Sequence, residues 1–528
     1  MPMPALASDL RKTLESTVVK ARELAERGAR DALAALDVPG NSHIPSMTAE
    51  QERLRRRLRA HGRQLGDQRD PQKGTQSIER LVREMAYEHW HRMLFARFLA
   101  ENQLLIEPTS GVAISLAECE ELAAEEGTDL WGLAAQFAQE MLPQIFRVDD
   151  PVLAAKLPLE IRQQLQGLVA SLEVEVFTAS DSLGWVYQFW QTLEKDRVNQ
   201  SETEIGADEL PAVTQIFTEP YMVDFLLHNS LGAWWVTRHP DKPCPVELSY
   251  LRTLEDGTPA AGKFEGWPDT LKEFMLLDPC CGSGHFLVAA FLLLVPMRMA
   301  SENLSASYAV DAVFAENLHG LELDARCVEI AVFALALAAW RFPGQDGNQL
   351  GVRKTMPSPK VACCGLKLIA TTAQWQALVP DTAPDADRLR AGLAQLHRAF
   401  SQAPLLGSLL HPGQAGEANL LAAGSEELEE FLEQALRQEL PLGAGTDSDQ
   451  TTEMALTAKG LMTAASLLDK KYNLVITNVP YLARSKQSEA LKEYSEARYS
   501  SAKNDLANVF LDRCIQLSRS GGGLASCK

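Results

Sequence analysis

Residues 276–291 read LLDPCCGSGHFLVAAF, and this stretch decides the fold class. Its first residues are apolar and end at Asp278, as in a buried strand. A turn with Gly282 and Gly284 follows, and an apolar helix is predicted to begin near His285. Glycines permit positive φ and a close backbone approach to a ligand, and the first N–H groups of a helix bind polar or anionic groups. The stretch therefore predicts a nucleotide-cofactor loop in a doubly wound α/β fold.

The loop departs from the dinucleotide fingerprint in one respect. A third glycine would stand three residues after Gly284, where this sequence has Leu287, so NAD is disfavoured as the cofactor. The structural alternative is a tight turn between a strand and a helix that binds no ligand.

Short apolar runs recur along the chain and alternate with helical segments. They lie at 274–278, 318–324, 360–366, 473–478 and 521–526. Short apolar strands that alternate with helices indicate parallel βαβ units, so we expect a doubly wound, Rossmann-like sheet.

Four regions follow from this pattern. We expect a helical N-terminal region at 1–210, because its apolar residues are spaced three and four apart and few strand signals occur. The first part of the sheet domain is expected at 211–370 and its second part at 471–528. Between them, 371–470 is expected to be an insertion that is partly helical, acidic and partly flexible.

The second strand also ends in acidic residues. In doubly wound folds an acid at the tip of this strand bonds ribose hydroxyls, and Glu322 is the candidate. Asp324 is predicted instead to cap the helix that begins at Ala325. The alternative for Glu322 is a purely structural carboxylate.

A fourth apolar run opens the stretch NLVITNVPYLARSK, residues 473–486. The amide oxygen of Asn478 and the backbone carbonyl of Val479 are suited to accept the two hydrogens of an exocyclic amine and to orient its lone pair toward an electrophile. Pro480 stiffens the turn, and Tyr481 is suited to stack on a flat base. The pattern favours a nucleobase amine as the target. A helix-capping Asn beside a packed Tyr is the alternative.

Composition limits the remaining choices. The 528 residues carry a formal charge of −20, which argues against wholesale nucleic-acid binding but allows a local basic groove. Residues 53–69 are rich in arginine and are interpreted either as a solvated arm or as a contact with the DNA backbone.

The sequence shows no signal peptide and no apolar run of membrane-spanning length. The longest candidate, FLVAAFLLLVPM from Phe286, is cut by Pro296 and is interpreted as a buried core helix. We therefore expect a cytoplasmic protein with no membrane partner. The nine cysteines form no CxxC pair and no Cys/His ladder, so no metal site is predicted.

The motifs DPCCGSGHFL, GLELD and TNVPYL, in this order, resemble the amino-group DNA methyltransferases that use S-adenosylmethionine, whose signature is Asn-Pro-Pro-Tyr. The chain most resembles the large adenine-N6 methyltransferases of type IIG restriction–modification and of BREX- or DISARM-like phage-defence systems. This resemblance implies methyl transfer from S-adenosylmethionine to adenine N6 in double-stranded DNA, with the adenine flipped out of the helix. It also allows for protein partners from a defence system, and it implies no metal.

The resemblance assigns roles by position, and 217–227 matches the segment that precedes the cofactor loop. The cofactor-binding residues that it implies are Thr218, Pro220, Tyr221, Asp278, Cys280, Gly282, Gly284, Glu322 and Gly365. The residues that it implies at the target base are Asn478, Val479, Pro480 and Tyr481.

Three departures from the family pattern leave alternatives open. Val479 replaces the first proline of the signature, and Leu366 stands where the family often has an acid for the adenine of the cofactor. The chain also stops within a predicted core strand, so we expect a fragment or one half of a split enzyme. The alternatives are a methyltransferase for RNA or for protein glutamine, and a catalytically weak DNA- or partner-binding component of a defence complex. A fused nuclease in 1–210 is disfavoured, because no convincing Asp…Glu-x-Lys pattern occurs there.

Overall fold

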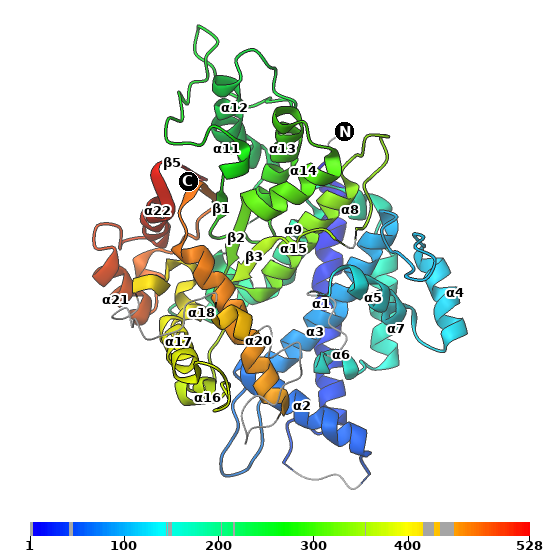
Figure 1. The fold of residues 1–528 in the computed structure, drawn as a ribbon. Coiled ribbons are helices and arrows are strands. Elements are labelled where there is room, and N and C mark those ends of the chain that lie inside the picture. The colour runs from blue at the N-terminus through cyan, green and yellow to red at the C-terminus, as the bar shows by residue number, and fades with distance from the viewer. Residues whose placement is uncertain are drawn as a thin grey trace. The chain divides into compact units, whose positions relative to one another are not determined.

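The chain forms two compact units, which comprise residues 1–193 with 352–354 and residues 194–351 with 355–528. The computed structural model describes residues 4–41, 46–143, 145, 150–201, 203–214, 217–353, 355–414, 427–432 and 448–527. Figure 1 shows the helices and strands of both units.

The first unit is helical, as predicted. Its helices are α1 (Ser8–Ala35), α2 (Ala49–Leu65), α3 (Glu79–Glu101), α4 (Leu116–Glu126), α5 (Leu130–Met141), α6 (Pro151–Ala154), α7 (Leu159–Ala170), α8 (Val174–Thr178) and the first part of α9 (Ser182–Ser201). The apolar stripe of α3 is buried, and Leu81, Met85 and Trp90 are at most 1% exposed. Burial of such a stripe, rather than helix propensity, supplies most of the stability of a helix in a protein.

The arginine-rich stretch forms α2, and two of its arginines are structural. The guanidinium of Arg59 donates to the carbonyls of Val38 (2.7 Å) and Gly74 (2.8 Å), and Arg55 donates to that of Asp37 (2.8 Å). Since these side chains satisfy backbone carbonyls of neighbouring loops, the interpretation of the whole stretch as a solvated arm is wrong for this part of α2.

The second unit contains a five-stranded sheet in which every neighbouring pair is parallel. The strands are β1 (Leu276–Asp278), β2 (Leu318–Glu322), β3 (Lys360–Cys363), β4 (Tyr472–Thr477) and β5 (Ser518–Ser526). Their order is β3-β2-β1-β4-β5, so the order reverses between β1 and β4. In open α/β sheets the ligand crevice lies at this switch point, outside the carboxyl ends of the strands.

Helices cover both faces of this sheet, which confirms the doubly wound, Rossmann-like fold (Figure 1). The helices of the second unit are α10 (Leu210–Thr214), α11 (Pro220–Leu227), α12 (Ala233–Arg238), α13 (His285–Glu302), α14 (Ala306–Ala312), α15 (Ala325–Arg341), α16 (Thr372–Gln376), α17 (Ala386–Ala399), α18 (Ala403–Leu406), α20 (Ser448–Asp469), α21 (Glu489–Arg498) and α22 (Leu506–Leu517). Single 3-10 turns lie at Leu271–Glu273, Gly407–Leu409, Pro412–Gln414 and Arg484–Lys486, and π-helical turns at His228–Gly232 and Val313–Asn317.

Alternation along the strands divides the core into two layers. Leu276 and Leu474 pack with α11 to α15, whereas their chain neighbours Leu277 and Val475 pack with α17, α20 and α22. Successive side chains of a strand point to opposite faces, so an all-apolar strand serves both layers. The second layer therefore includes helices from 371–470.

A buried arginine on α22 attaches the segment after α18 to the sheet domain. Arg513 is 3% exposed and donates to the carbonyls of Ser408 (3.0 Å) and Leu410 (2.7 Å). It also contacts His411, whose other ring nitrogen bonds the hydroxyl of Tyr499 (2.9 Å). These bonds fix the segment at Gly407–Leu409 beside the tips of the strands.

Helix α13 is a core helix, as predicted, although it does not end at Pro296. Among the described residues it is the one helix long and apolar enough to cross a membrane, and half of that window is buried in the protein. The helix continues through Pro296 to Glu302. Proline removes one helical hydrogen bond, and here the packing on both sides of it is sufficient to keep the helix intact.

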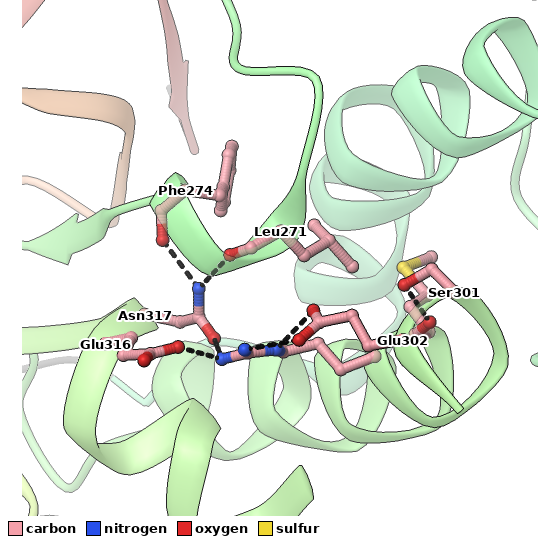
Figure 2. A network of polar contacts seen from close by, with 8 residues as sticks. Leu271, Phe274, Ser301, Glu302, Glu316 and Asn317 are labelled. Atoms are coloured by element: carbon pink, nitrogen blue, oxygen red, sulfur yellow. Dashed lines mark hydrogen bonds and ion pairs between the residues drawn. The ribbon is translucent and has the colours of Figure 1, made fainter. Parts of the chain in front are cut away.

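The last turns of α13 are held by a buried polar network, which Figure 2 shows. Arg298 is 2% exposed and donates to Glu302 (2.7 Å), to Glu316 (2.6 Å) and to the amide oxygen of Asn317 (3.1 Å). The amide nitrogen of Asn317 donates in turn to the carbonyls of Leu271 and Phe274, at 2.7 and 2.6 Å. The network thus joins α13 to the backbone just before β1 and helps to place the loop that follows β1.

Candidate functional site

The two predicted motifs follow neighbouring strands at the switch point. Leu276 of β1 pairs with Leu474 of β4, and Leu277 pairs with Val475, in parallel register. The glycine turn that follows β1 and the Asn478 turn that follows β4 consequently leave the same edge of the sheet, next to each other.

Glycine is present at the two positions of the first turn for different structural reasons. Gly282 has φ +51°, and apart from its chain neighbours no atom of a described residue lies within 4 Å of the position that a Cβ would occupy there. Gly284 has φ +83° and precedes α13; a Cβ at this position would lie 2.9 Å from the Cβ of Ala331 on α15. Gly282 therefore borders open space, whereas Gly284 lets α13 approach α15 closely.

Asp278, at the tip of β1, is a buried carboxyl that is only partly satisfied. Its Oδ1 accepts from the backbone N–H of Cys280 (3.1 Å). Its Oδ2 and the hydroxyl of Thr477 are both buried and form no hydrogen bond of good geometry with a described residue, although the two groups lie close enough to interact with each other. Burial, with a contribution from the nearby carboxylate of Glu322, raises the pKa of Asp278 to about 7, against the opposing effects of the Thr477 hydroxyl and the Cys280 N–H.

Glu322, at the tip of β2, reaches back to the glycine turn. Its Oε2 accepts from the backbone N–H of Gly282 (2.7 Å), and its Oε1 accepts from those of Leu323 (2.7 Å) and Asp324 (3.2 Å). Burial raises the pKa of Glu322, and these three backbone N–H groups oppose the rise. The carboxylate of Glu322 therefore connects the tip of β2 to the glycine turn.

The prediction for Asp324 is confirmed. It caps α15, since its carboxylate accepts from the backbone N–H of Arg326 (3.0 Å) and from the guanidinium of the same residue. Two acids two residues apart thus have separate structural roles.

Asn478 is held by a residue 260 positions away in the chain. Its Nδ2 donates to the hydroxyl oxygen of Thr218 (3.1 Å), while no described residue donates to its Oδ1. Val479 is 1% exposed, and no backbone N–H in the described part of the chain donates to its carbonyl. Two acceptors next to each other in the turn are thus left available.

Thr218 also contacts the glycine turn, through a histidine that the sequence did not single out. The Nδ1 of His285 lies 2.9 Å from the carbonyl oxygen of Thr218, so this nitrogen carries the hydrogen. The ring of His285 stacks on that of Phe217, with centroids 4.7 Å apart and planes 6° apart. Since His285 directly follows Gly284, Thr218 connects the first motif to the third.

The remaining predicted residues contact the site less closely. Pro220 is the first residue of α11, and Tyr221 on the same helix is 52% exposed. Tyr481 is 38% exposed, and its hydroxyl donates to the carbonyl of Cys527. Pro480 is partly buried.

The tip of β3 and the segment after α18 close the other side of the glycine turn. At Gly365 a Cβ would lie 2.1 Å from the carbonyl oxygen of Leu323, so only glycine fits beside the tip of β2. The thiol of Cys280 lies 3.9 Å from the hydroxyl of Ser408, and burial raises its pKa well above the usual range. Cys280 is therefore a neutral thiol and contributes packing. Ser408 gives no signal in the sequence, because only the fold brings 407–409 to this edge.

These residues fit S-adenosylmethionine. The open space at Gly282 accommodates a ligand, the buried carboxyl of Asp278 suits a cationic amino group, and the carboxylate of Glu322 suits a hydroxyl.

The parallel sheet, its switch point and the glycine turn define a Rossmann-like domain, a class of fold in which ligands bind at the carboxyl ends of the strands. Residues 316–526 match the family profile described as Eco57I restriction-modification methylase. The resemblance that the motifs predicted is thereby confirmed.

Two curated relatives are adenine-specific methyltransferases by name. BrxX of Escherichia coli O9:H4 (strain HS) is 26% identical in an alignment 406 positions long, gaps included, that covers 72% of this chain and 32% of the relative. PglX of Lacticaseibacillus casei (strain Zhang) is 23% identical in an alignment 532 positions long, gaps included, that covers 90% of this chain and 42% of the relative. The chain thus spans less than half the length of these relatives.

Solved structures of restriction–modification enzymes are also similar to the chain. The DrdV–DNA complex matches with a TM-score of 0.40 and 13% identity over 98% of this chain and 35% of that one. The type IIL enzyme MmeI in complex with DNA matches with a TM-score of 0.36 and 12% identity over 98% of this chain and 49% of that one.

Proposed function

We propose that this protein transfers a methyl group from S-adenosylmethionine to N6 of adenine in DNA, as part of a restriction–modification or phage-defence system. The observation that carries the proposal is the hydrogen bond from Nδ2 of Asn478 to Thr218, because it leaves the amide oxygen of Asn478 available at the same edge of the sheet as the glycine turn. The names of the relatives BrxX and PglX support the choice of adenine.

The residues proposed to hold S-adenosylmethionine are those around the glycine turn. Asp278 and the backbone of Thr218 would face its methionine end, Glu322 would accept from a ribose hydroxyl, and Gly282 would lie against the cofactor. Gly284, Cys280 and Gly365 would shape the pocket through the backbone.

The target amine is proposed to lie between two acceptors. The amide oxygen of Asn478 and the carbonyl of Val479 would each accept one N6 hydrogen, which directs the nitrogen lone pair toward the cofactor and stabilises the positive charge that develops on nitrogen. When bound, the cofactor supplies a sulfonium methyl group: a bond forms between this carbon and N6, the carbon–sulfur bond breaks with its electron pair on sulfur, and N6 then releases a proton to solvent.

The nucleic-acid partner is proposed to be double-stranded DNA with the adenine flipped out, because the amine is inaccessible inside the base stack. Tyr481 is exposed enough to stack on the flipped base, and Pro480 restricts the turn that carries it. Action on DNA in a bacterial defence system corresponds to a cytoplasmic location.

The test is methylation of plasmid DNA by the full-length protein, read by base-resolved sequencing, with Asn478→Ala as the comparison. We expect N6-methyladenine with the wild type and a loss of about 10²-fold or more with the variant, since an oriented acceptor at the reacting amine is removed. Equal methylation by both proteins would disprove the role of Asn478. Parallel assays with RNA and with a glutamine-containing protein separate the alternative substrates, and DNA binding without any methylation would favour a scaffold component.

A further inference from the structure

We infer that Thr218 and His285 are positioning residues that set the orientation of the Asn478 amide. The inference rests on the proposed function, because it concerns how the same amide accepts a target amine. Thr218 thereby has a role in addition to its place near the cofactor. His285, for which the sequence predicted no role, holds Thr218 in position.

An asparagine amide has two nearly isosteric ends with opposite hydrogen-bonding character. The oxygen accepts and the nitrogen donates, so rotation by half a turn would present N–H groups to an incoming amine, which also donates. A target amine is therefore bound in only one of the two orientations. Some protein group must hold the nitrogen end for the oxygen end to face the substrate.

Thr218 holds the nitrogen end when the hydrogen of its own hydroxyl points away from the amide, since a hydroxyl can both donate and accept. Its hydroxyl oxygen accepts from Nδ2 of Asn478 at 3.1 Å, and Thr218 is itself 7% exposed, so little water competes for this bond. No donor to Oδ1 of Asn478 occurs among the residues that the structure describes. The amide is thus fixed on one side and available on the other.

His285 holds Thr218. Its Nδ1–H donates to the Thr218 carbonyl at 2.9 Å, and its ring stacks nearly parallel on Phe217, the residue before Thr218. Thr218 precedes α11 and has no regular secondary structure of its own, so these two contacts restrict its backbone. His285 is the first residue of α13 and directly follows the glycine turn. The hydrogen bonds from His285 to Thr218 and from Asn478 to Thr218 therefore connect the proposed cofactor loop to the amide.

The experiment separates this role from a contact with the cofactor. The full-length protein would carry Thr218→Val, which keeps the shape but removes the acceptor, or Thr218→Ser, which keeps the hydroxyl. We expect Thr218→Val to lower kcat by about 10–100-fold, as a misplaced catalytic group does. Its Kd for S-adenosylhomocysteine, measured by calorimetry, should stay within about threefold of the wild-type value. A tenfold change in Kd would correspond to about 1.4 kcal/mol of binding free energy. Thr218→Ser should restore most of kcat. Thr237→Val, which removes a partly buried hydroxyl from α12, is the matched control and should leave both values unchanged.

His285 is tested in the same way. His285→Ala removes the donor and the stacked ring, whereas His285→Asn keeps an N–H near the position of Nδ1, so we expect a loss of kcat with Ala and partial rescue with Asn. The Thr218→Val/His285→Ala double variant should lose hardly more than Thr218→Val alone, because residues that act through one group are not additive.

The possible failures are distinguishable. If the wild-type protein methylates no DNA, the proposed function is wrong and the inference is overturned with it. If the wild type methylates DNA but Thr218→Val keeps its kcat and binds the cofactor more weakly, Thr218 is a cofactor contact and only the inference fails. Thermal unfolding of every variant accompanies the kinetics. If Thr218→Val does not fold, the His285 variants decide. Loss of kcat in folded His285→Ala, with rescue by His285→Asn, supports the positioning role. An unchanged kcat in His285→Ala overturns it.

Discussion

At the scale of single residues, the site is marked by buried polar atoms whose hydrogen bonds are incomplete. Nearly all buried polar groups in proteins are paired, so an unpaired one requires an explanation. Oδ2 of Asp278 and the hydroxyl of Thr477 lie at the tips of adjacent strands and interact with each other, although neither forms a hydrogen bond of good geometry among the described residues. A bound ligand that donates to Oδ2 would complete the hydrogen bonding of this carboxyl.

The carboxyl of Asp278 makes stability depend on pH. Its pKa in the folded protein, about 7, lies above the ordinary value of 3.8, so its stabilising effect is complete below about pH 4 and is lost as the pH rises through 7. Each pH unit in this window costs up to about 1.4 kcal/mol. We expect Asp278→Asn to flatten the loss of stability between pH 4 and 7 in urea unfolding. Glu265→Gln, which changes an exposed carboxyl, is the control, and an unchanged slope in Asp278→Asn would contradict the burial of a neutral carboxyl.

The two glycines of the turn should respond differently to alanine. At either position positive φ costs an alanine about 1–2 kcal/mol. Gly284→Ala should destabilise the protein further, because the new Cβ would lie 2.9 Å from Ala331, whereas Gly282→Ala meets no atom within 4 Å and should instead impair cofactor binding. Unfolding and calorimetry measure the two effects. Gly347→Ala, at φ +82° with no nearby atom, is the control for backbone strain alone. Unimpaired cofactor binding by Gly282→Ala would show that the open space is not the cofactor site.

At the scale of elements, the described part of the region 371–470 packs against the sheet and belongs to the core of the second unit. Its helices α17 and α20 form a layer on one face of the sheet, and its segment at Gly407–Leu409 lies against the strand tips. The composition of this region predicts a partly helical insertion but does not indicate what its helices pack against. The packing follows from the apolar faces of α17 and α20, which have the sheet as their partner.

Arg513 should be the main attachment of this segment to α22. It donates to the carbonyls of Ser408 and Leu410 from a buried position, so Arg513→Met leaves buried carbonyls unpaired and should cost about 2–4 kcal/mol of unfolding free energy. Arg388→Met removes an ion pair with Glu427 in which both side chains are nearly half exposed, and it should cost less than about 1 kcal/mol. Urea unfolding compares the two, and hydrogen exchange should rise near 407–410 only in Arg513→Met. Equal costs in both variants would show that the buried bonds do not hold the segment.

At the scale of the whole molecule, the proposed cofactor site lies entirely within the second compact unit. A ligand that binds only the folded state stabilises by about 2.7 kcal/mol at a hundred times its Kd. If the two units unfold in separate calorimetric transitions, we expect S-adenosylhomocysteine to raise the Tm of one of them and to leave the other unchanged. Asn478→Ala should keep this shift, because the amide is proposed to serve the target base. A shift in neither transition would contradict cofactor binding by this chain.

The amino-acid sequence by itself determined the strands, the glycine turn and the acid at the tip of β2. These depend on residues close together in the chain: apolar runs bounded by glycine and acidic residues, and the helix that begins at His285 after the turn. It also determined that Asp324 caps α15, because a cap is formed with the next helical residues.

Only the tertiary structure decided which of these residues act together. Thr218 and Asn478 are 260 positions apart, and Glu322 and Gly282 are 40 apart, so no local pattern indicates either bond. The order β3-β2-β1-β4-β5 brings the first and fourth strands side by side, and long-range packing on both faces of the sheet fixes that order. Local propensity specifies the elements, whereas the burial of their apolar faces selects the neighbours that complete the site.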